Sequence, residues 1–196
     1  TDKLSFTDVS VDLSLSAVLA QSTETQLRSL IELYIAFFNR VPDAEGMHYW
    51  LQQMLDGKSL SQIADSFYAA GKLYPDLTGY SDSLSNAEFV KILYKNVLGR
   101  SGSSAPTVTE IDYWANDIQS GRQSRSSVVI AMLASARSLV NDPSVGWVTR
   151  LLNNKINVGR FLSIEQGLSY LNPNDNISKS IATAALITAD DTEQAL

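Results

Sequence analysis

The amino-acid sequence predicts an all-α fold made of two homologous three-helix units and a C-terminal helical cap, with a short N-terminal β arm. Three observations lead to this prediction. A motif occurs twice, apolar side chains recur at helical spacing around both copies, and strict alternation of apolar and polar residues is confined to residues 4–15. The 196 residues contain 44% hydrophobic side chains, which suffices for a packed core.

The repeated motif organises the chain. Its first copy runs from Leu33-Tyr34 to Arg40 and continues with Tyr49-Trp50 and Gly57. Its second copy runs from Leu93-Tyr94 to Arg100 and continues with Tyr113-Trp114 and Gly121. The spacing within each half is the same, and only the link between the halves is longer in the second copy. We therefore expect a tandem repeat domain over residues 21–143, with units at about 23–73 and 85–138.

Residues 1–20 are expected to form the β arm. Alternating apolar and polar side chains from Leu4 to Leu15 are typical of one or two half-buried strands. Because a lone strand pair is marginally stable, two interpretations stay open. Either the arm continues a sheet of an upstream region, or it is an ordered arm packed on the helices. The chain begins without Met and without a signal-peptide pattern, so we expect a piece of a longer protein.

Residue types at helix ends delimit the predicted helices. Capping boxes, in which Ser or Thr is followed three residues later by Gln or Glu, begin at Thr23, Ser59, Ser85 and Thr107. Asp43 is expected to be the N-cap of the second helix, and Ser124 opens the last helix of the second unit. Residues 74–85 and 99–106 are rich in turn-forming residues and are expected to be loops.

After Pro143 the repeat is lost, and residues 144–196 are expected to close the same domain as an atypical helical cap. Apolar residues predict one helix around residues 145–152, another around 158–168, and a last one from Ile177. The polar run from Asn172 to Asn176 is expected to be a loop.

Composition excludes several classes of protein. The formal net charge of −6 disfavours binding to nucleic acid, which needs clustered Lys and Arg. The chain has no cysteine, which excludes disulfides, thiolate catalysis and sulfur-based zinc sites. No stretch approaches the ~20 apolar residues of a membrane-spanning helix.

Catalysis has little support in the sequence, and we expect no enzyme. A Ser-His-Asp triad would have to use His48, the single histidine, and no G-x-S-x-G motif supplies a nucleophile. A carboxylate-pair enzyme acting on glycans is the less favoured alternative. Its candidate acids are better explained as helix caps, first-turn residues or solvated side chains. They are Asp43, Glu45, Asp56, Glu110, Asp112 and Asp117.

Aromatic residues next to each other in both copies suggest a binding surface. Trp50 and Trp114 fall on apolar helix faces and are expected in the core. Tyr49 and Tyr113 are expected at the surface, where their rings would stack on sugars.

Polar candidates accompany the tyrosines. Asp43 is a candidate polar contact for the ligand. Arg40 and Arg100 end matching helices, and we favour caps of the last carbonyls over clamps for an acidic sugar. No metal motif is present, but Asn174 and Asp175 offer oxygen ligands that suit calcium.

These motifs resemble the bacterial "domain of unknown function" family numbered forty-two fourteen. The second copy, from Glu88 to Arg100 and on to Tyr113-Trp114, resembles that family's most typical line. The resemblance runs from about Leu27 to Asp190, and it includes a Pro-Asp-x-x-Gly turn that only the first copy keeps. The opening segment, Lys3 to Asp8, resembles the end of an RTX-type calcium-binding sheet region.

The resemblance implies the kind of protein in which the domain occurs and its location, but not a mechanism. Relatives occur in secreted proteins, RTX-type adhesins and S-layer proteins of bacteria, which implies an extracellular or cell-surface location. We therefore expect a non-catalytic module of a larger secreted protein that binds surface polysaccharide or lipopolysaccharide, with no cofactor except possible calcium. The alternative is a scaffold that contacts only neighbouring protein domains, as the similar helical repeat of phycobilisome linkers suggests.

Overall fold

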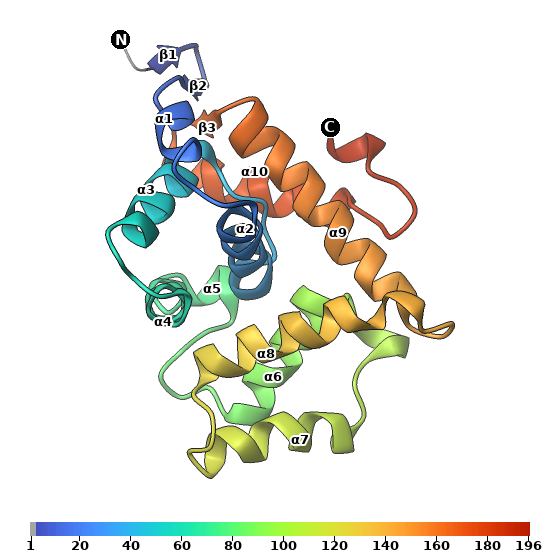
Figure 1. Cartoon of the computed structure of the whole chain (residues 1–196). Coiled ribbons are helices and arrows are strands. Elements are labelled where there is room, and N and C mark those ends of the chain that lie inside the picture. Colours follow the sequence, from blue (N-terminus) through green and yellow to red (C-terminus); the bar gives the residue numbers. More distant parts are fainter. Residues whose placement is uncertain (1–2) are drawn as a thin grey trace.

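The computed structural model describes residues 3–196, and it confirms the predicted fold class. Helix α2 (Glu24–Phe38) lies at the centre, with α3 (Ala44–Leu55) and α4 (Leu60–Gly71) beside it (Figure 1). These three helices form the first unit. The second unit consists of α6 (Asn86–Leu98), α7 (Val108–Gln119) and α8 (Arg125–Ser138). Helix α9 (Gly146–Arg160) crosses from the second unit back to α2 and contacts both.

The helices begin where the capping residues predict. All four capping boxes are formed, with each hydroxyl accepting the N3 backbone N–H and each N3 side chain accepting the N-cap backbone N–H. Asp43 caps α3 by accepting the backbone N–H of Gly46, and Ser124 caps α8 by accepting that of Ser127. Local sequence therefore fixes where each helix of the two units starts.

The linkers contain short helical turns that the loop predictions missed. Helix α5 (Pro75–Thr78) lies between the two units, and a 3₁₀ turn, η1 (Gly102–Ser104), lies between α6 and α7. A further turn, η2 (Leu139–Asn141), follows α8 directly. Pro75 at the first position of α5 favours this turn, because proline is already set for helix there.

The N-terminal arm pairs with the far end of the chain. Strand β2 (Val9–Asp12) pairs with β1 (Lys3–Ser5) and with β3 (Leu168–Tyr170), both antiparallel. Helix α1 (Leu15–Leu19) then packs on α3. Gly167 has φ +63°, and a Cβ there would lie 3.0 Å from the Asp12 carbonyl oxygen. The arm is thus ordered and packs against α3, and its pairing with β3 was not foreseen. That the arm continues a sheet of an upstream region stays a prediction.

The cap differs from the prediction in two places. The residues expected to form two helices instead form α9 and a π-helical turn, η3 (Phe161–Glu165), which continues it without a break. Leu168, expected in the second of those helices, lies in strand β3. The run from Asn172 to Asn176 is not a loop, because Asn172 caps α10 (Pro173–Leu186) and the next residues form its first turn. Proline at the first helical position and Asn at the N-cap are start signals that the turn interpretation overlooked. A 3₁₀ turn, η4 (Glu193–Ala195), ends the chain.

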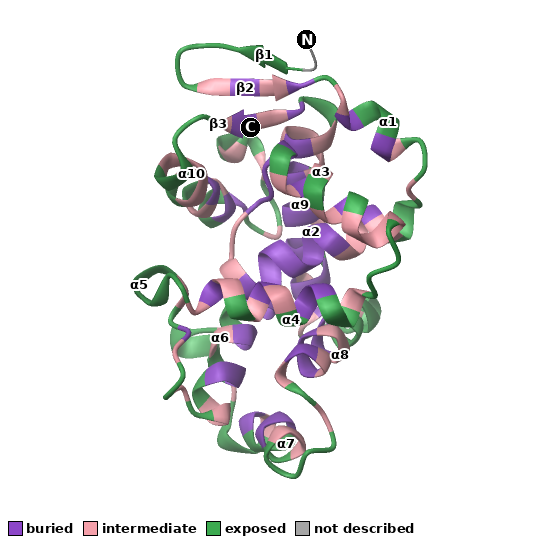
Figure 2. Ribbon diagram, turned by 90° about the vertical axis from the view of Figure 1, so that its left-hand side faces the viewer, coloured by how far each residue is buried: buried purple, intermediate pink, exposed green. Residues whose placement is uncertain are grey.

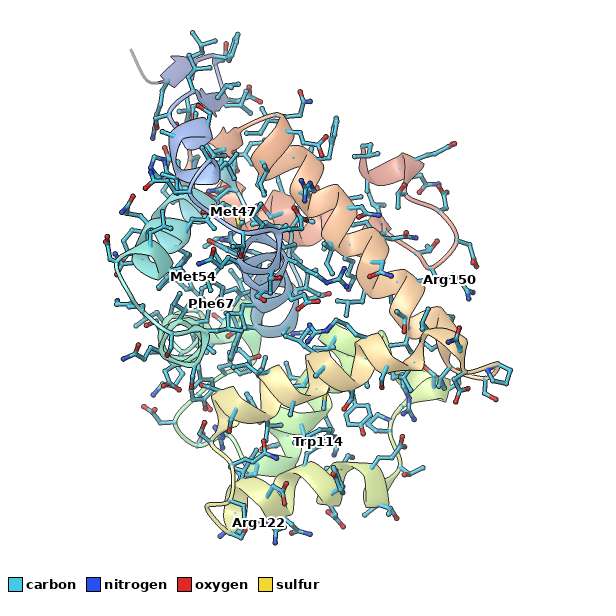
Figure 3. All side chains as sticks on the ribbon, viewed as in Figure 1. Met47, Met54, Phe67, Trp114, Arg122 and Arg150 are labelled. Atoms are coloured by element: carbon cyan, nitrogen blue, oxygen red, sulfur yellow. The ribbon has the colours of Figure 1, made fainter. Side chains whose placement is uncertain are left out.

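One apolar core joins both units around α2. Residues 30–37 of α2 are all buried, and Figure 2 shows this helix as the centre of the buried region. Met47 and Phe67 point from α3 and α4 toward α2, while Trp114 lies inside the second unit (Figure 3). The buried carboxylate of Glu32 accepts hydrogen bonds from Arg28 at 3.0 Å and from Arg137 of α8 at 2.5 Å. A buried charge needs such partners, so this contact also fixes how the two units meet.

A buried lysine lies where α9 meets both units. Lys155 donates to the side-chain oxygen of Asn39, at the end of α2, at 2.7 Å and to the carbonyl of Asn96 in α6 at 3.4 Å. Asn96 in turn donates to the carbonyl of Ala36 at 3.0 Å. Burial, with a smaller effect from the charge of Lys95, lowers the pKa of Lys155 to about 8.

We predict that Lys155 makes the domain less stable at neutral pH than at pH 9.5. The folded-state pKa is lowered, so the unfolded chain binds the proton more tightly between about pH 8 and 10.5. Stability from this group therefore rises with pH across that window. Urea unfolding of Lys155→Met should show a stability difference from the parent that changes with pH, with Lys91→Met as the exposed control. A pH-independent difference would contradict the prediction.

Candidate functional site

The repeated motif builds the same side-chain cluster in each unit, which we call the tyrosine–arginine clasp. In the first unit it consists of Tyr34, Arg40, Asp43 and Trp50. The Arg40 guanidinium lies 4.9 Å from the centre of the Tyr34 ring, and its Nη2 donates to Asp43 Oδ2 at 3.2 Å. Asp43 Oδ1 accepts the Gly46 backbone N–H at 2.8 Å. The clasp thus ties the end of α2 to the start of α3.

The second clasp consists of Tyr94, Arg100, Glu110 and Trp114. The Arg100 guanidinium lies 5.2 Å from the centre of the Tyr94 ring. It donates through Nη1 and Nη2 to the two oxygens of Glu110, and through Nε to the carbonyl of Ser104 at 3.1 Å. The acid comes from the third position of α7 instead of the N-cap, because the longer link displaces the start of that helix.

The clasps correct our expectation for the two arginines. Arg40 and Arg100 were expected to cap the carbonyls at the end of their own helices. Their guanidinium groups instead pair with the first carboxylate of the following helix and lie over a tyrosine of the preceding one. Asp43 is buried and already accepts two hydrogen bonds. These three candidate residues therefore hold the fold, and a ligand-binding role for them stays a prediction.

The clasps shift the pKa values of their members. Burial, followed by the charge of Asp43, raises the pKa of Tyr34, although the charge of Arg40 and the polar groups of Arg40 and Trp50 oppose the rise. Hydrogen bonds from Arg100, followed by those from Thr107, lower the pKa of Glu110 to about 2 although partial burial opposes this. Tyr34 therefore stays neutral and Glu110 stays ionised across the physiological range.

The aromatic pairs divide as the sequence predicts. Trp114 is buried and Trp50 packs partly against the core. Tyr49 is 53% exposed and Tyr113 is 66% exposed. Each tyrosine ring stands edge-on to its neighbouring tryptophan, with ring centres 4.8 Å apart in the first unit and 5.0 Å apart in the second. The two units therefore present the same supported, exposed ring at equivalent positions.

A cavity of about 170 Å³ adjoins the first clasp. Its walls come from α2, α3 and α4, from the segment between Tyr74 and Thr78, and from Ile177 and Ile181 of α10. Tyr34, Arg40 and Trp50 of the clasp line this cavity, so one of its walls consists of residues of the repeated motif. The other walls were missed because residues 74–78 were interpreted as a loop, and because the predicted helix from Ile177 carries no local signal of where it packs.

His48 does not belong to a catalytic triad. Its Nδ1 lies 2.9 Å from Asp12 Oδ2 and 3.4 Å from the hydroxyl of Ser14. A triad places the acid and the nucleophile on opposite ring nitrogens, whereas both lie on Nδ1 here. Burial raises the pKa of Asp12, but hydrogen bonds from Ser14 and His48 outweigh it and lower the value. This cluster fastens the β arm to α3.

No group of three or more His, Asp or Glu residues within residues 3–196 is arranged to hold a metal ion. Asn174 and Asp175 lie in the first turn of α10, where Asp175 approaches Lys179 at 3.6 Å. Polar side chains are common in the first turn of a helix, so neither residue needs a metal to explain it. The calcium hypothesis stays a prediction. Among the same residues, no helix is both long enough and apolar enough to span a membrane.

The fold and the clasps define a tandem helical repeat, and comparison with protein families finds a match to part of it. Residues 77–139 match the family described as "Domain of unknown function (DUF4214)". This is the family that the motifs resemble, so that prediction is confirmed. The match covers the second unit and is narrower than the span from Leu27 to Asp190 that we expected. Neither the curated proteins nor the solved structures contain a significant match to the chain.

We predict that Gly46→Ala destabilises the domain, although this change normally stabilises a helix by about 1 kcal/mol. A Cβ at Gly46 would overlap the hydroxyl oxygen of Tyr34. We expect a loss of about 1–3 kcal/mol in the free energy of unfolding, as for other overpacked sites. The double variant Gly46→Ala/Tyr34→Phe removes the overlapping oxygen and should recover part of the loss. No recovery in chemical denaturation would show that this overlap is not the cause.

We predict that Glu110→Gln flattens the acid side of the stability profile. The lowered pKa means that Glu110 contributes stability above about pH 4.5 and loses it as the pH falls toward 2. Glu110 is about one-third exposed, so we expect about 1 kcal/mol or less at pH 7. Asp112→Asn is the matched control, because Asp112 is exposed on the same helix. Equal acid profiles for both variants in urea unfolding would contradict the prediction.

Proposed function

We propose that this chain is a non-catalytic module of a larger secreted bacterial protein, and that it binds carbohydrate of the cell surface. The observation that carries the proposal is the pair of exposed rings, Tyr49 and Tyr113, at equivalent positions of the two units. A polysaccharide or lipopolysaccharide chain repeats its sugars, so a protein that repeats its aromatic contact suits it. Two weak contacts on one polymer add up through effective concentration when both can engage.

The support of each ring favours this use. A tyrosine held edge-on against a tryptophan loses little freedom when it binds, so less of the contact energy is lost to ordering. An exposed tyrosine also combines an apolar face with a hydroxyl, which matches a sugar ring that has apolar faces and polar edges. The resemblance to domains of adhesins and S-layer proteins supports the proposed place at the cell surface.

Three of the acidic candidates, Glu110, Asp117 and Asp43, do not favour an enzyme on glycans. Such an enzyme needs one carboxylic acid with a raised pKa as the proton donor. Glu110 has a pKa of about 2, and hydrogen bonds from Arg122 and Gln123 lower the pKa of Asp117. Asp43 already pairs with Arg40.

A scaffold that binds neighbouring protein domains is the second candidate function. Large apolar side chains are exposed outside the aromatic pairs, including Leu73 at 75% and Val108 at 73%. Scattered single residues of this kind are common on protein surfaces, so they support the scaffold less than the repeated rings support carbohydrate binding.

We predict that Tyr49→Ala and Tyr113→Ala each weaken binding to the producing organism's own surface polysaccharide about fivefold, from the loss of about 1 kcal/mol of aromatic contact. Calorimetry of the purified chain should show saturable heat for the parent. Val108→Ala, an exposed apolar change on the same helix as Tyr113, should bind like the parent. Parent-like binding by both tyrosine variants would remove the proposed site.

The same titration, repeated with a chelator, tests whether binding to the polysaccharide depends on calcium. Loss of heat would support the predicted calcium dependence, and unchanged heat would rule it out. No heat in either condition would contradict the carbohydrate proposal and favour the scaffold.

A further inference from the structure

The cavity beside the first clasp is shaped for one small ring. Its volume of about 170 Å³ is close to the ~150 Å³ of an engineered apolar cavity that binds benzene in another protein. Pockets for drug-sized ligands begin at about 300 Å³, so this cavity suits a smaller molecule. The cavity therefore has room for a single six-membered ring and a small substituent.

The walls of this cavity are mainly apolar. Phe38 and Trp50 contribute aromatic surface, and Ile177 and Ile181 of α10 contribute aliphatic surface. A ring that carries several hydroxyl groups would leave them without partners against such walls, at a cost of roughly 1–3 kcal/mol each. The ring that fits is apolar, which sets this site apart from the proposed carbohydrate surface.

Arg40 is the single charged residue that lines the cavity. It is also the clasp arginine that gives fewer hydrogen bonds. Arg100 gives three hydrogen bonds, two of them to Glu110. Arg40 gives one to a carboxylate in the described part of the chain, at 3.2 Å, and its guanidinium lies over the Tyr34 ring. A guanidinium has five N–H donors in a planar fork that fits a carboxylate, so Arg40 can accept a further anionic partner.

The negative charge of Asp43 does not prevent Arg40 from binding a further anion. One oxygen of Asp43 is held by the Gly46 backbone N–H, at the start of α3, where the helix dipole favours a negative charge. Both acids also accept hydrogen bonds at the start of their helices, Asp43 from Gly46 and Glu110 from Thr107. The difference is that Asp43 meets Arg40 through one oxygen, whereas Glu110 meets Arg100 through both, so Arg40 has the weaker carboxylate contact.

We propose that this cavity binds a small monocyclic carboxylic acid, with its apolar ring between Trp50 and α10 and its carboxylate on Arg40. The proposal does not rest on carbohydrate binding, because neither Tyr49 nor Tyr113 lines the cavity. An experiment that contradicts carbohydrate binding would therefore not contradict binding of a carboxylic acid in the cavity, and the reverse also holds.

The test uses benzoate as the probe and the three tryptophan indole N–H signals as reporters in NMR spectra of the full chain. The Trp50 signal, assigned with Trp50→Phe, should shift saturably with a dissociation constant below about 1 mM. The Trp114 signal from the other unit should stay in place. Benzamide, which lacks the charge, should bind at least about tenfold more weakly, and glucuronate, an acid with a hydroxylated ring, should not bind.

Two variants and a matched control complete the test. Ala70→Leu fills the cavity from α4 and should abolish the shift while the remaining spectrum is kept. Arg40→Lys should weaken benzoate binding about tenfold, because the fork is lost. Arg100→Lys makes the same change in the other clasp and should bind like the parent. A Trp50 signal that benzoate does not move, equal binding of benzamide, or parent-like binding by Ala70→Leu would each overturn the proposal.

Discussion

The burial of α2 on all sides is the constraint on which the rest of the structure depends. Eight consecutive residues of this helix, 30–37, are buried, so elements must cover every face of it. Helices α3 and α4 cover one part, α6 and α8 of the second unit another, and α9 a third. Two charged groups within this interior, Glu32 and Lys155, find partners in other elements. The two units therefore form one body, since neither can be removed without exposing α2.

The clasps explain why the motif repeats. Tyrosine, arginine, tryptophan and the following acid meet in one cluster in each unit, and they set how the first helix of the unit turns into the second. Equivalent residues need not have equal surroundings. The short turn of the first unit supplies the acid from an N-cap, whereas the long link of the second supplies it from inside α7. The arginine of the second unit consequently gives three hydrogen bonds, whereas the equivalent arginine of the first unit gives one to a carboxylate and lines a cavity.

The arm and the cap depend on each other through the small sheet. Strand β2 joins β3, which follows the π-helical turn of α9, and His48 ties the same strand to α3. Helix α10 leaves this sheet and closes the cavity over the first unit, where the second unit lacks an equivalent helix in the described residues. The cap thus makes the two homologous units chemically different, and the proposed ligand site exists in only one of them.

The sequence by itself determined the features that rest on neighbouring residues. Capping boxes at Thr23, Ser59, Ser85 and Thr107 and the apolar periodicity around them fixed the helices of both units, because caps and helical faces are local. It also separated the buried Trp114 from the exposed Tyr113, since adjacent residues on a helix point in different directions. Tertiary structure alone decided the pairing of β2 with β3, the partners of Arg40 and Arg100, and the cavity under α10. These contacts join residues far apart in the chain, and their geometry depends on how the helices pack, which no local pattern encodes.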